Sequence, residues 1–250
     1  MLRLPTTTVT GECVSIYPMT ALGVLRVAGM AIGTAVMSLG GLAVMPTASA
    51  EPCPDVQVVF ARGTNEPAGL GFVGQAFADS LRAQLPGRSV AVYAVNYPAS
   101  DDYLRSAAVG SDDASNHIQN VVAGCPKTGM VLGGYSQGAA VTELSMEALP
   151  AAVADHVDAV ALFGSPTSEF SKMLAGGAAL PTVSPLYAAK TIDLCITDDP
   201  ICSPGANMMA HVSYVPAGLA NQAATFAAEK IDQASGPVVS EPSNGGGASR

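Results

Sequence analysis

The run Gly134–Gly138 (GYSQG) carries the most specific chemical signal in the chain. It fits the pattern G-x-S-x-G, occurs once in the sequence, and falls between an apolar run and a segment with helical spacing. A strand that turns sharply into a helix exposes a serine at the bend and requires glycine on either side, because larger side chains would collide there. The serine hydroxyl then lies at the helix N-terminus, where backbone N–H groups can stabilise an oxyanion. The pattern predicts that Ser136 is a nucleophile.

A serine hydroxyl attacks a carbonyl carbon effectively only when a nearby base takes its proton at neutral pH, and histidine is the usual base. In enzymes with this turn the chain order is serine, acid, histidine. His117 precedes Ser136, and His156 leaves little room for an acid before it. His211 is therefore the predicted base, and the alternative for it is a surface histidine just before the last helix. Activity should then fall as the pH drops through the titration of a histidine, near pH 6.5 for a free imidazole.

The acid is expected between Ser136 and His211, in the run Cys195–Cys202 (CITDDPIC). Spacing alone does not separate Asp198 from Asp199. A disulfide across this run would restrain the carboxylate that orients the imidazole. Without that disulfide both residues are interpreted as solvated turn aspartates. Three weaker candidates flank or lie within predicted strands: Asp155, Asp158 and Asp193.

Apolar runs alternate with helix-length segments, which predicts a single α/β domain in which helices cover both faces of a five-stranded parallel sheet, a three-layer α/β/α sandwich. The expected strands are 56–61, 89–96, 130–133, 157–163 and 190–194. The expected helices are 71–85, 111–122, 137–149 and 212–231. The run 62–65 (RGTN) follows the first strand as a loop and is expected to have a functional role.

The N-terminal part has the layout of a signal peptide. Residues 27–44 are uncharged and rich in small residues, with Arg26 before them and Ala48-Ser49-Ala50 after them. A retained membrane anchor is the alternative, but the Gly and Ala content and the lack of a following basic cluster favour cleavage after Ala50. Met19 is an alternative start that the sequence leaves open. The sequence predicts a signal peptide over 1–50, a domain over 51–234, and a disordered tail over 235–250.

Composition narrows the function further. The chain has 11 Lys or Arg against 20 Asp or Glu and a formal net charge of −9, which argues against nucleic acid and anionic membranes as partners. Of five cysteines, Cys13 lies in the predicted signal segment, and the four that remain suggest two disulfides in an exported chain, with three pairings open. The chain has three histidines and no C-x-x-C, so neither a metal site nor another cofactor is predicted.

Four blocks in order resemble the cutinase family, particularly its actinobacterial secreted esterases, over residues 53–234. The blocks are Phe60–Thr64 (FARGT), Gly133–Ala139 (GGYSQGA), the Cys195–Cys202 loop, and His211–Tyr214 (HVSY). The resemblance implies a small α/β-hydrolase without a large lid that acts on carboxylic esters. It assigns the nucleophile to Ser136, the acid to Asp199 and the base to His211.

The same resemblance implies two disulfides and an oxyanion hole. The disulfides would be Cys53 with Cys125 and Cys195 with Cys202. The oxyanion hole would consist of the backbone N–H of Gln137 and position 64, where cutinases of the fungal type carry Ser. Here position 64 is Thr64, whose hydroxyl can still donate but whose methyl group crowds the pocket.

The predicted protein is thus a secreted, monomeric ester hydrolase that forms an acyl-enzyme on short to medium acyl esters, without a membrane anchor after cleavage. Apolar residues expected at the acyl pocket are Leu180, Val183, Leu186, Met208 and Met209, with ordinary core packing as the alternative for them. Two alternative functions remain open. The chain could be a catalytically silent secreted binding protein or antigen that keeps the hydrolase fold, or an acyltransferase that uses the same Ser136, Asp199 and His211.

Overall fold

The computed structural model describes residues 52–236. The predicted signal segment 1–50 lies outside these residues, as does the predicted tail from residue 237 onward. Within the described part of the chain, no helix is both long and apolar enough to cross a membrane.

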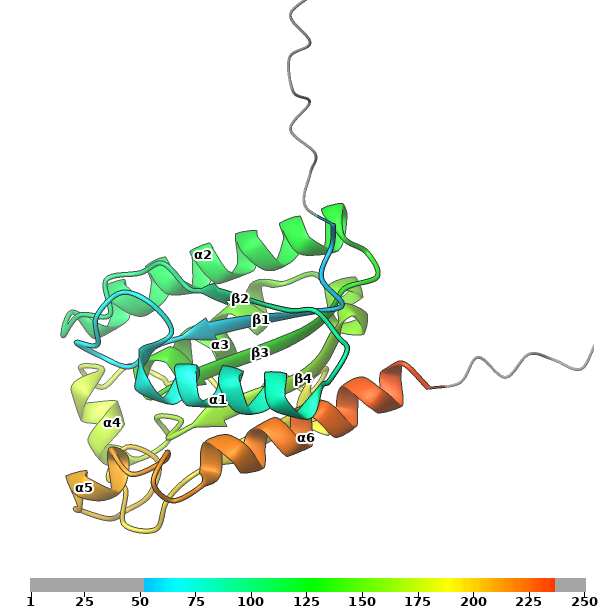
Figure 1. Ribbon diagram of the computed structural model, residues 1–250. Coiled ribbons are helices and arrows are strands. Elements are labelled where there is room, and N and C mark those ends of the chain that lie inside the picture. The colour runs from blue at the N-terminus through cyan, green and yellow to red at the C-terminus, as the bar shows by residue number, and fades with distance from the viewer. Residues whose placement is uncertain (1–51, 237–250) are drawn as a thin grey trace, which may run out of the picture. The chain divides into compact units, whose positions relative to one another are not determined.

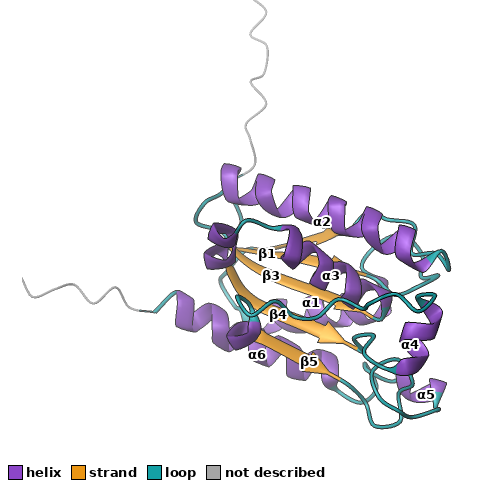
Figure 2. Ribbon diagram, turned by 180° about the vertical axis from the view of Figure 1, so that it is seen from behind, coloured by secondary structure: helices purple, strands orange, loops and turns teal. Residues whose placement is uncertain are grey.

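The centre of the molecule is a parallel sheet of five strands (Figures 1 and 2). The strands are β1 (Val56–Ala61), β2 (Val90–Ala94), β3 (Gly129–Tyr135), β4 (Val157–Phe163) and β5 (Thr191–Leu194), in the spatial order β2-β1-β3-β4-β5. Central strands buried on both faces are apolar without alternation, and all six residues of β1 are buried. The predicted five-stranded parallel sheet is confirmed.

Four long helices cover the two faces of the sheet. Helices α1 (Gly71–Gln84) and α6 (Leu219–Ala234) pack on one face, and α2 (Tyr103–Gly124) and α3 (Gln137–Ala148) on the other (Figure 1). β1 shows how one strand serves both layers, because Val58 and Phe60 belong to the core under α1 and α6 while Val59 belongs to the core under α2 and α3. This is the predicted three-layer arrangement.

The order of the strands places a crevice at the carboxyl end of the sheet. The chain runs from β1 to β2 on one side and returns to β3 on the other side of β1. Ligands of open α/β sheets bind where the strand order reverses in this way, beyond the carboxyl ends of the strands. Two short helices, α4 (Glu169–Leu174) and α5 (Met208–His211), lie at this end.

Two helices begin at other residues than the sequence predicts, whereas the helix ends differ by no more than three residues. α2 begins at Tyr103 and not at Ser111, because the small residues Ala107, Gly110 and Ser111 are buried inside the helix, where α2 packs closely on α3. α6 begins at Leu219 and not at residue 212, because α5 ends at His211 and Gly218 has a φ of 79°. The sequence does not predict α4 and α5, since helices of six and four residues are too short to show helical periodicity.

Candidate active site

Ser136 lies at the bend between β3 and α3, as the G-x-S-x-G pattern predicts. Its φ of 56° and ψ of −121° are a strained combination for a residue with a side chain. A Cβ atom on Gly134 would lie 2.0 Å from the carbonyl oxygen of Gly138, and one on Gly138 would lie 2.0 Å from that of Ala61. Both glycines are therefore required by close backbone contacts around the serine.

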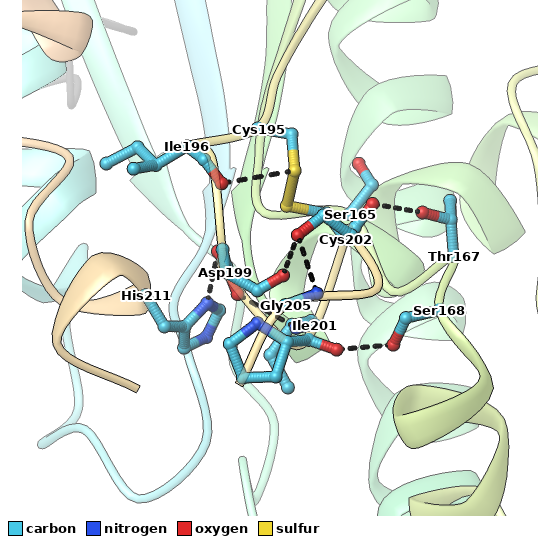
Figure 3. Close-up of a disulfide and its surroundings, with 12 residues drawn as sticks. Ser165, Thr167, Ser168, Cys195, Ile196, Asp199, Ile201, Cys202, Gly205 and His211 are labelled. Carbon is cyan, nitrogen blue, oxygen red and sulfur yellow. Dashed lines mark hydrogen bonds and ion pairs between the residues drawn. A yellow bond between two sulfur atoms is a disulfide. The ribbon is translucent and has the colours of Figure 1, made fainter. Parts of the chain in front are cut away.

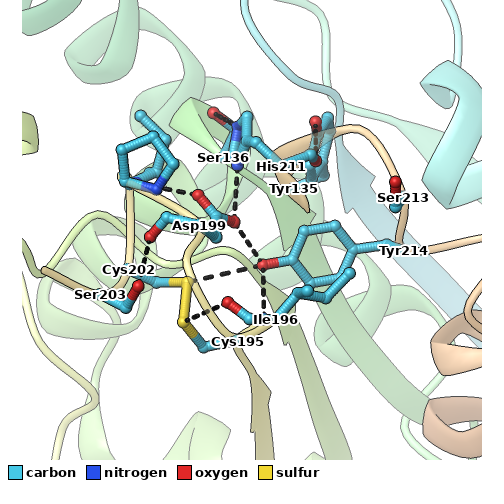
Figure 4. A network of polar contacts seen from close by, with 12 residues as sticks. Tyr135, Ser136, Cys195, Ile196, Asp199, Cys202, Ser203, His211, Ser213 and Tyr214 are labelled. Atoms are coloured by element: carbon cyan, nitrogen blue, oxygen red, sulfur yellow. Dashed lines mark hydrogen bonds and ion pairs between the residues drawn. A yellow bond between two sulfur atoms is a disulfide. The ribbon is translucent and has the colours of Figure 1, made fainter. Parts of the chain in front are cut away.

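The three residues predicted for catalysis are brought together from distant parts of the chain (Figure 4). His211 Nε2 lies 2.9 Å from Ser136 Oγ, and His211 Nδ1 lies 2.8 Å from Asp199 Oδ2. His211 is the last residue of α5, and its side chain is only 7% exposed. One imidazole thus contacts a hydroxyl on one side and a carboxylate on the other.

The structure separates the two neighbouring aspartates. Asp198 is exposed and has a φ of 68°, whereas Asp199 is fully buried and faces His211. Burial opposes the ionisation of Asp199, but hydrogen bonds from His211, Tyr214 and the Ile201 backbone N–H outweigh burial and hold its pKa below the ordinary value. Asp199 is therefore suited to remain a carboxylate beside the imidazole.

A disulfide joins the two ends of the loop that carries Asp199 (Figure 3). Cys195 and Cys202 are bonded with a Cα–Cα distance of 5.9 Å, and Cys53 is bonded to Cys125, the pairing that the resemblance implies. Hydrogen bonds from Ser168 and Thr167 to Pro200 and Cys202 carbonyl groups tie the loop to the segment before α4. The Asp199 carboxylate therefore has a rigid support.

The remaining acids and histidines weighed in the sequence lie elsewhere. Asp193 on β5 accepts a hydrogen bond from Ser165, and burial raises the pKa of Asp158 on β4 to about 6. His117 on α2 stacks on Tyr93 with ring centroids 3.5 Å apart, and burial lowers its pKa. None of these three residues lines the cavity at Ser136, and neither do Asp155 and His156.

Thr64 and Gln137, the two predicted oxyanion positions, line the same cavity as Ser136. Gln137 is the first residue of α3, where backbone N–H groups lack partners within the helix. Its side chain is buried, accepts a hydrogen bond from Ser106 Oγ at 2.9 Å, and donates to the Ser100 carbonyl at 2.9 Å. These bonds fix the position of Gln137 at the start of the helix.

Two charged residues, Arg62 and Glu66, support the loop that carries Thr64, a role that is not apparent from the sequence. Arg62 is 6% exposed, and its guanidinium donates to the carbonyl groups of Glu66 and Tyr97, each at 2.8 Å. The Glu66 carboxylate accepts from the backbone N–H groups of Gly63 at 2.6 Å and Phe72 at 2.7 Å. Arg62 is part of the sequence block FARGT. Because it donates to backbone carbonyl groups and not to a carboxylate, no acidic partner in the sequence indicates its role.

The cavity beside Ser136 has a volume of about 350 Å³. Its apolar wall is formed by Tyr135, Pro166, Leu174, Ile201, Met208 and Val212. Of the five residues expected at the acyl pocket, only Met208 lines it, so that expectation is wrong for Leu180, Val183, Leu186 and Met209. Val183 instead packs against the core under α2 and α3, and α4, which the sequence did not reveal, supplies Leu174.

A parallel sheet that presents a serine at a sharp strand-to-helix turn, with an imidazole and a buried carboxylate in line behind it, defines the α/β-hydrolase class. Comparison with known proteins narrows this class. The cutinase family model matches residues 52–231. The chain therefore belongs to the cutinase family, and it is a serine ester hydrolase.

Individual relatives agree with this assignment. The chain is 60% identical over 216 residues to carboxylesterase Culp1 of Mycobacterium tuberculosis. The matched region covers 86% of this chain and all of the relative. It is 49% identical over 199 residues to phospholipase Culp4 of the same species, covering 76% of this chain and 84% of that one. Among solved structures it is similar to Trichoderma reesei cutinase in complex with a C11Y4 phosphonate inhibitor, with a TM-score of 0.60, 37% identity, and coverage of 72% and 78%.

Proposed function

We propose that this protein is a secreted, cutinase-like carboxylic ester hydrolase in which Ser136, His211 and Asp199 act as a catalytic triad. The observation that carries the proposal is the unbroken line of short contacts from Ser136 Oγ through the His211 imidazole to Asp199 Oδ2. Such a line lets the imidazole accept the serine proton while the carboxylate holds its orientation.

The reaction follows from these contacts in two steps. Ser136 Oγ attacks the ester carbonyl carbon, and His211 Nε2 takes the hydroxyl proton and passes it to the departing alcohol oxygen. Water then attacks the acyl-enzyme carbonyl carbon and gives a proton to His211 Nε2, which passes it to Ser136 Oγ as the bond to the acyl group breaks and the carboxylic acid is released. The Gln137 backbone N–H and the Thr64 hydroxyl are the donors proposed for the oxyanion of both tetrahedral intermediates.

The cavity supports esters of short to medium acyl chains. Its volume of about 350 Å³ is near the lower end of the range for small-molecule sites, and its wall is largely apolar. The names of two mycobacterial relatives, carboxylesterase and phospholipase, also support ester substrates of a lipid-like kind.

Export is supported by the signal-peptide layout of the N-terminal part and by two disulfides, which are typical of oxidising compartments. We propose that the chain acts outside the cell as a monomer after cleavage following Ala50.

The test is ester turnover across a series of acyl chain lengths by wild type and Ser136→Ala. Ser80→Ala, on α1, is the matched control. We expect Ser136→Ala to lose at least about a thousandfold in kcat and to fail to react with a serine-directed phosphonate, because the nucleophile is gone. The Ser80→Ala variant should match wild type in both measurements.

Retained turnover or phosphonate labelling in Ser136→Ala would contradict the triad. A turnover maximum on long acyl chains would contradict the proposed substrate range. Product analysis with a competing alcohol distinguishes hydrolysis from acyl transfer, since an acyltransferase forms mainly the new ester.

A further inference from the structure

The side chain of Tyr214 contacts the carboxylate that faces His211. Its hydroxyl donates to Asp199 Oδ2 at 2.6 Å, and His211 Nδ1 lies 2.8 Å from that same oxygen. Figure 4 shows both contacts meeting at Asp199. The second carboxylate oxygen, Oδ1, accepts from the Ile201 backbone N–H at 2.8 Å. Two donors therefore share the one oxygen that orients the imidazole.

The hydroxyl of Tyr214 is held in this place from several directions. Tyr214 is fully buried, and its ring stands edge-on to Phe163 at 87° and to His211 at 88°. The hydroxyl oxygen also accepts from the Ile196 backbone N–H at 3.4 Å, on the other side of the Asp199 loop. Because packing fixes the ring, the hydroxyl oxygen stays within hydrogen-bond distance of the carboxylate.

The same surroundings keep this hydroxyl protonated. Burial, the hydrogen bond to Asp199, and the charge of Asp199 all raise the pKa of Tyr214 well above the ordinary value of a tyrosine. The Tyr214 hydroxyl therefore keeps its proton and donates it in the hydrogen bond. Asp199 stays ionised and accepts this bond, since its pKa is lowered.

We propose that Tyr214 is a positioning residue that fixes Asp199 Oδ2 toward His211 and moderates how strongly this carboxylate stabilises the imidazolium. The proposal rests on the triad proposed above. A neutral donor on Oδ2 takes part of the negative charge that would otherwise face the imidazole. With the hydroxyl present, the resting imidazole stays free to accept the Ser136 proton at lower pH. Without it, the imidazolium is stabilised more strongly and the carboxylate is less firmly held.

Other ionisable groups near the imidazole do not share this role. Tyr135 of β3 stacks on His211 with centroids 5.0 Å apart, but its hydroxyl donates to the His211 backbone carbonyl at 2.7 Å. The Glu66 carboxylate, which faces Tyr135 from the loop after β1, is engaged by two backbone N–H groups. Asp198 is exposed on the neighbouring turn. Among the described residues, Tyr214 is the one side chain besides His211 that donates to the Asp199 carboxylate.

The experiment compares wild type, Tyr214→Phe and Tyr187→Phe by kcat and KM on a soluble short-chain ester between pH 5 and 9. Active sites are counted by phosphonate titration, so that rates refer to folded enzyme. Tyr187 is a matched control, because it is also buried and its hydroxyl has no hydrogen-bond partner in the part of the chain that the structure describes.

For Tyr214→Phe we expect the acid limb of kcat/KM to move to higher pH by about half a unit to one unit. We also expect kcat on the plateau to fall by about tenfold, with KM changed less than about twofold, because a hydrogen bond to a charged group is lost beside the base. Tyr187→Phe should superimpose on wild type.

A uniform fall in kcat without movement of the acid limb would overturn the proposal, since it would show general loosening of the site. Profiles identical to wild type would overturn it as well, and so would a Tyr214→Phe chain that cannot be recovered folded, because the hydroxyl would then serve the fold. Failure of the triad itself is a separate outcome, seen as retained turnover in Ser136→Ala.

Discussion

Gly164, the first residue after β4, is expected to support activity although it carries no reactive group. Its φ is +60°, and a Cβ atom built on it would lie 3.0 Å from His211 Cε1, 3.0 Å from the Tyr214 hydroxyl, and 3.2 Å from Asp199 Oδ2. A single methyl group at this position would press on all three. The perturbation we consider is therefore Gly164→Ala.

Two effects of this change can be separated by magnitude. A residue with a side chain in the left-handed region costs about 1–2 kcal/mol, which corresponds to a loss of roughly 2–8 °C in Tm for a domain of this size. The contacts at 3.0 Å require His211 and its partners to move by a few tenths of an ångström. Since a misplacement of about 1 Å can cost a hundredfold in rate, we expect kcat to fall by about tenfold.

Gly87→Ala is the matched control. Gly87 has a φ of +85° and nothing within 4 Å of its virtual Cβ, so it carries the backbone strain without the contact. The assay is turnover of a short-chain ester at several concentrations together with thermal unfolding of both variants. We expect similar losses in Tm and a loss of kcat only in Gly164→Ala. Equal kcat values in the two variants, after correction for folded protein, would refute the contact as the cause.

Two further predictions concern the disulfides and a buried acid. Replacing Cys195 and Cys202 by Ser removes a disulfide that closes a short loop and contributes about 2 kcal/mol to the free energy of unfolding. Replacing Cys53 and Cys125 removes one that closes a long loop and contributes about 4 kcal/mol. The first pair should nevertheless lose more kcat and the second more Tm, and the opposite ranking in turnover and unfolding assays would contradict the support of Asp199 by its disulfide. Burial raises the pKa of Glu143 from 4.5 to about 8, so the native state keeps a proton that the unfolded chain releases, and stability should fall as the pH rises through this window. Thermal unfolding should therefore show that Tm falls less between pH 5 and pH 8 for Glu143→Gln than for wild type. An equal fall of Tm in both proteins would contradict a buried, protonated Glu143.

The fold and the centre of the site were predictable because both depend on signals that are dense in the sequence. Central parallel strands are mostly apolar without alternation, as β1 and β4 show with a single polar residue each, and the helix-length segments between strands leave few possible arrangements of the fold. Ser136 lies in a pattern whose glycines are dictated by backbone contacts, and His211 follows from chain order among only three histidines.

Other parts of the site could not be predicted because their residue types are common. Tyr214 and Arg62 both fall in blocks that resemble the cutinase family, yet tyrosine and arginine have many uses in proteins. Only the fold shows that Tyr214 donates to Asp199 and that Arg62 donates to carbonyl groups that support the loop after β1. The first residue of α2 could not be predicted because Ser111, a residue type that often caps the start of a helix, is a buried residue within α2. The wall of the cavity was missed because α4 is too short to show a period.

The choice between Asp198 and Asp199 shows where local sequence information ends. The two carboxylates are chemically the same and adjacent, so the backbone of the turn must decide which one faces inward. Asp198 adopts the left-handed conformation, which aspartate tolerates better than most residues, and its carbonyl accepts from the Asn207 N–H at 3.0 Å. Gly205 lies directly against this backbone, where a Cβ would come within 2.2 Å of Asp198 Cα. The turn is thereby fixed with the Asp198 side chain outward, so that the Asp199 carboxylate faces the His211 imidazole. The contact that decides between the two aspartates is made by Gly205, which lies outside the run Cys195–Cys202.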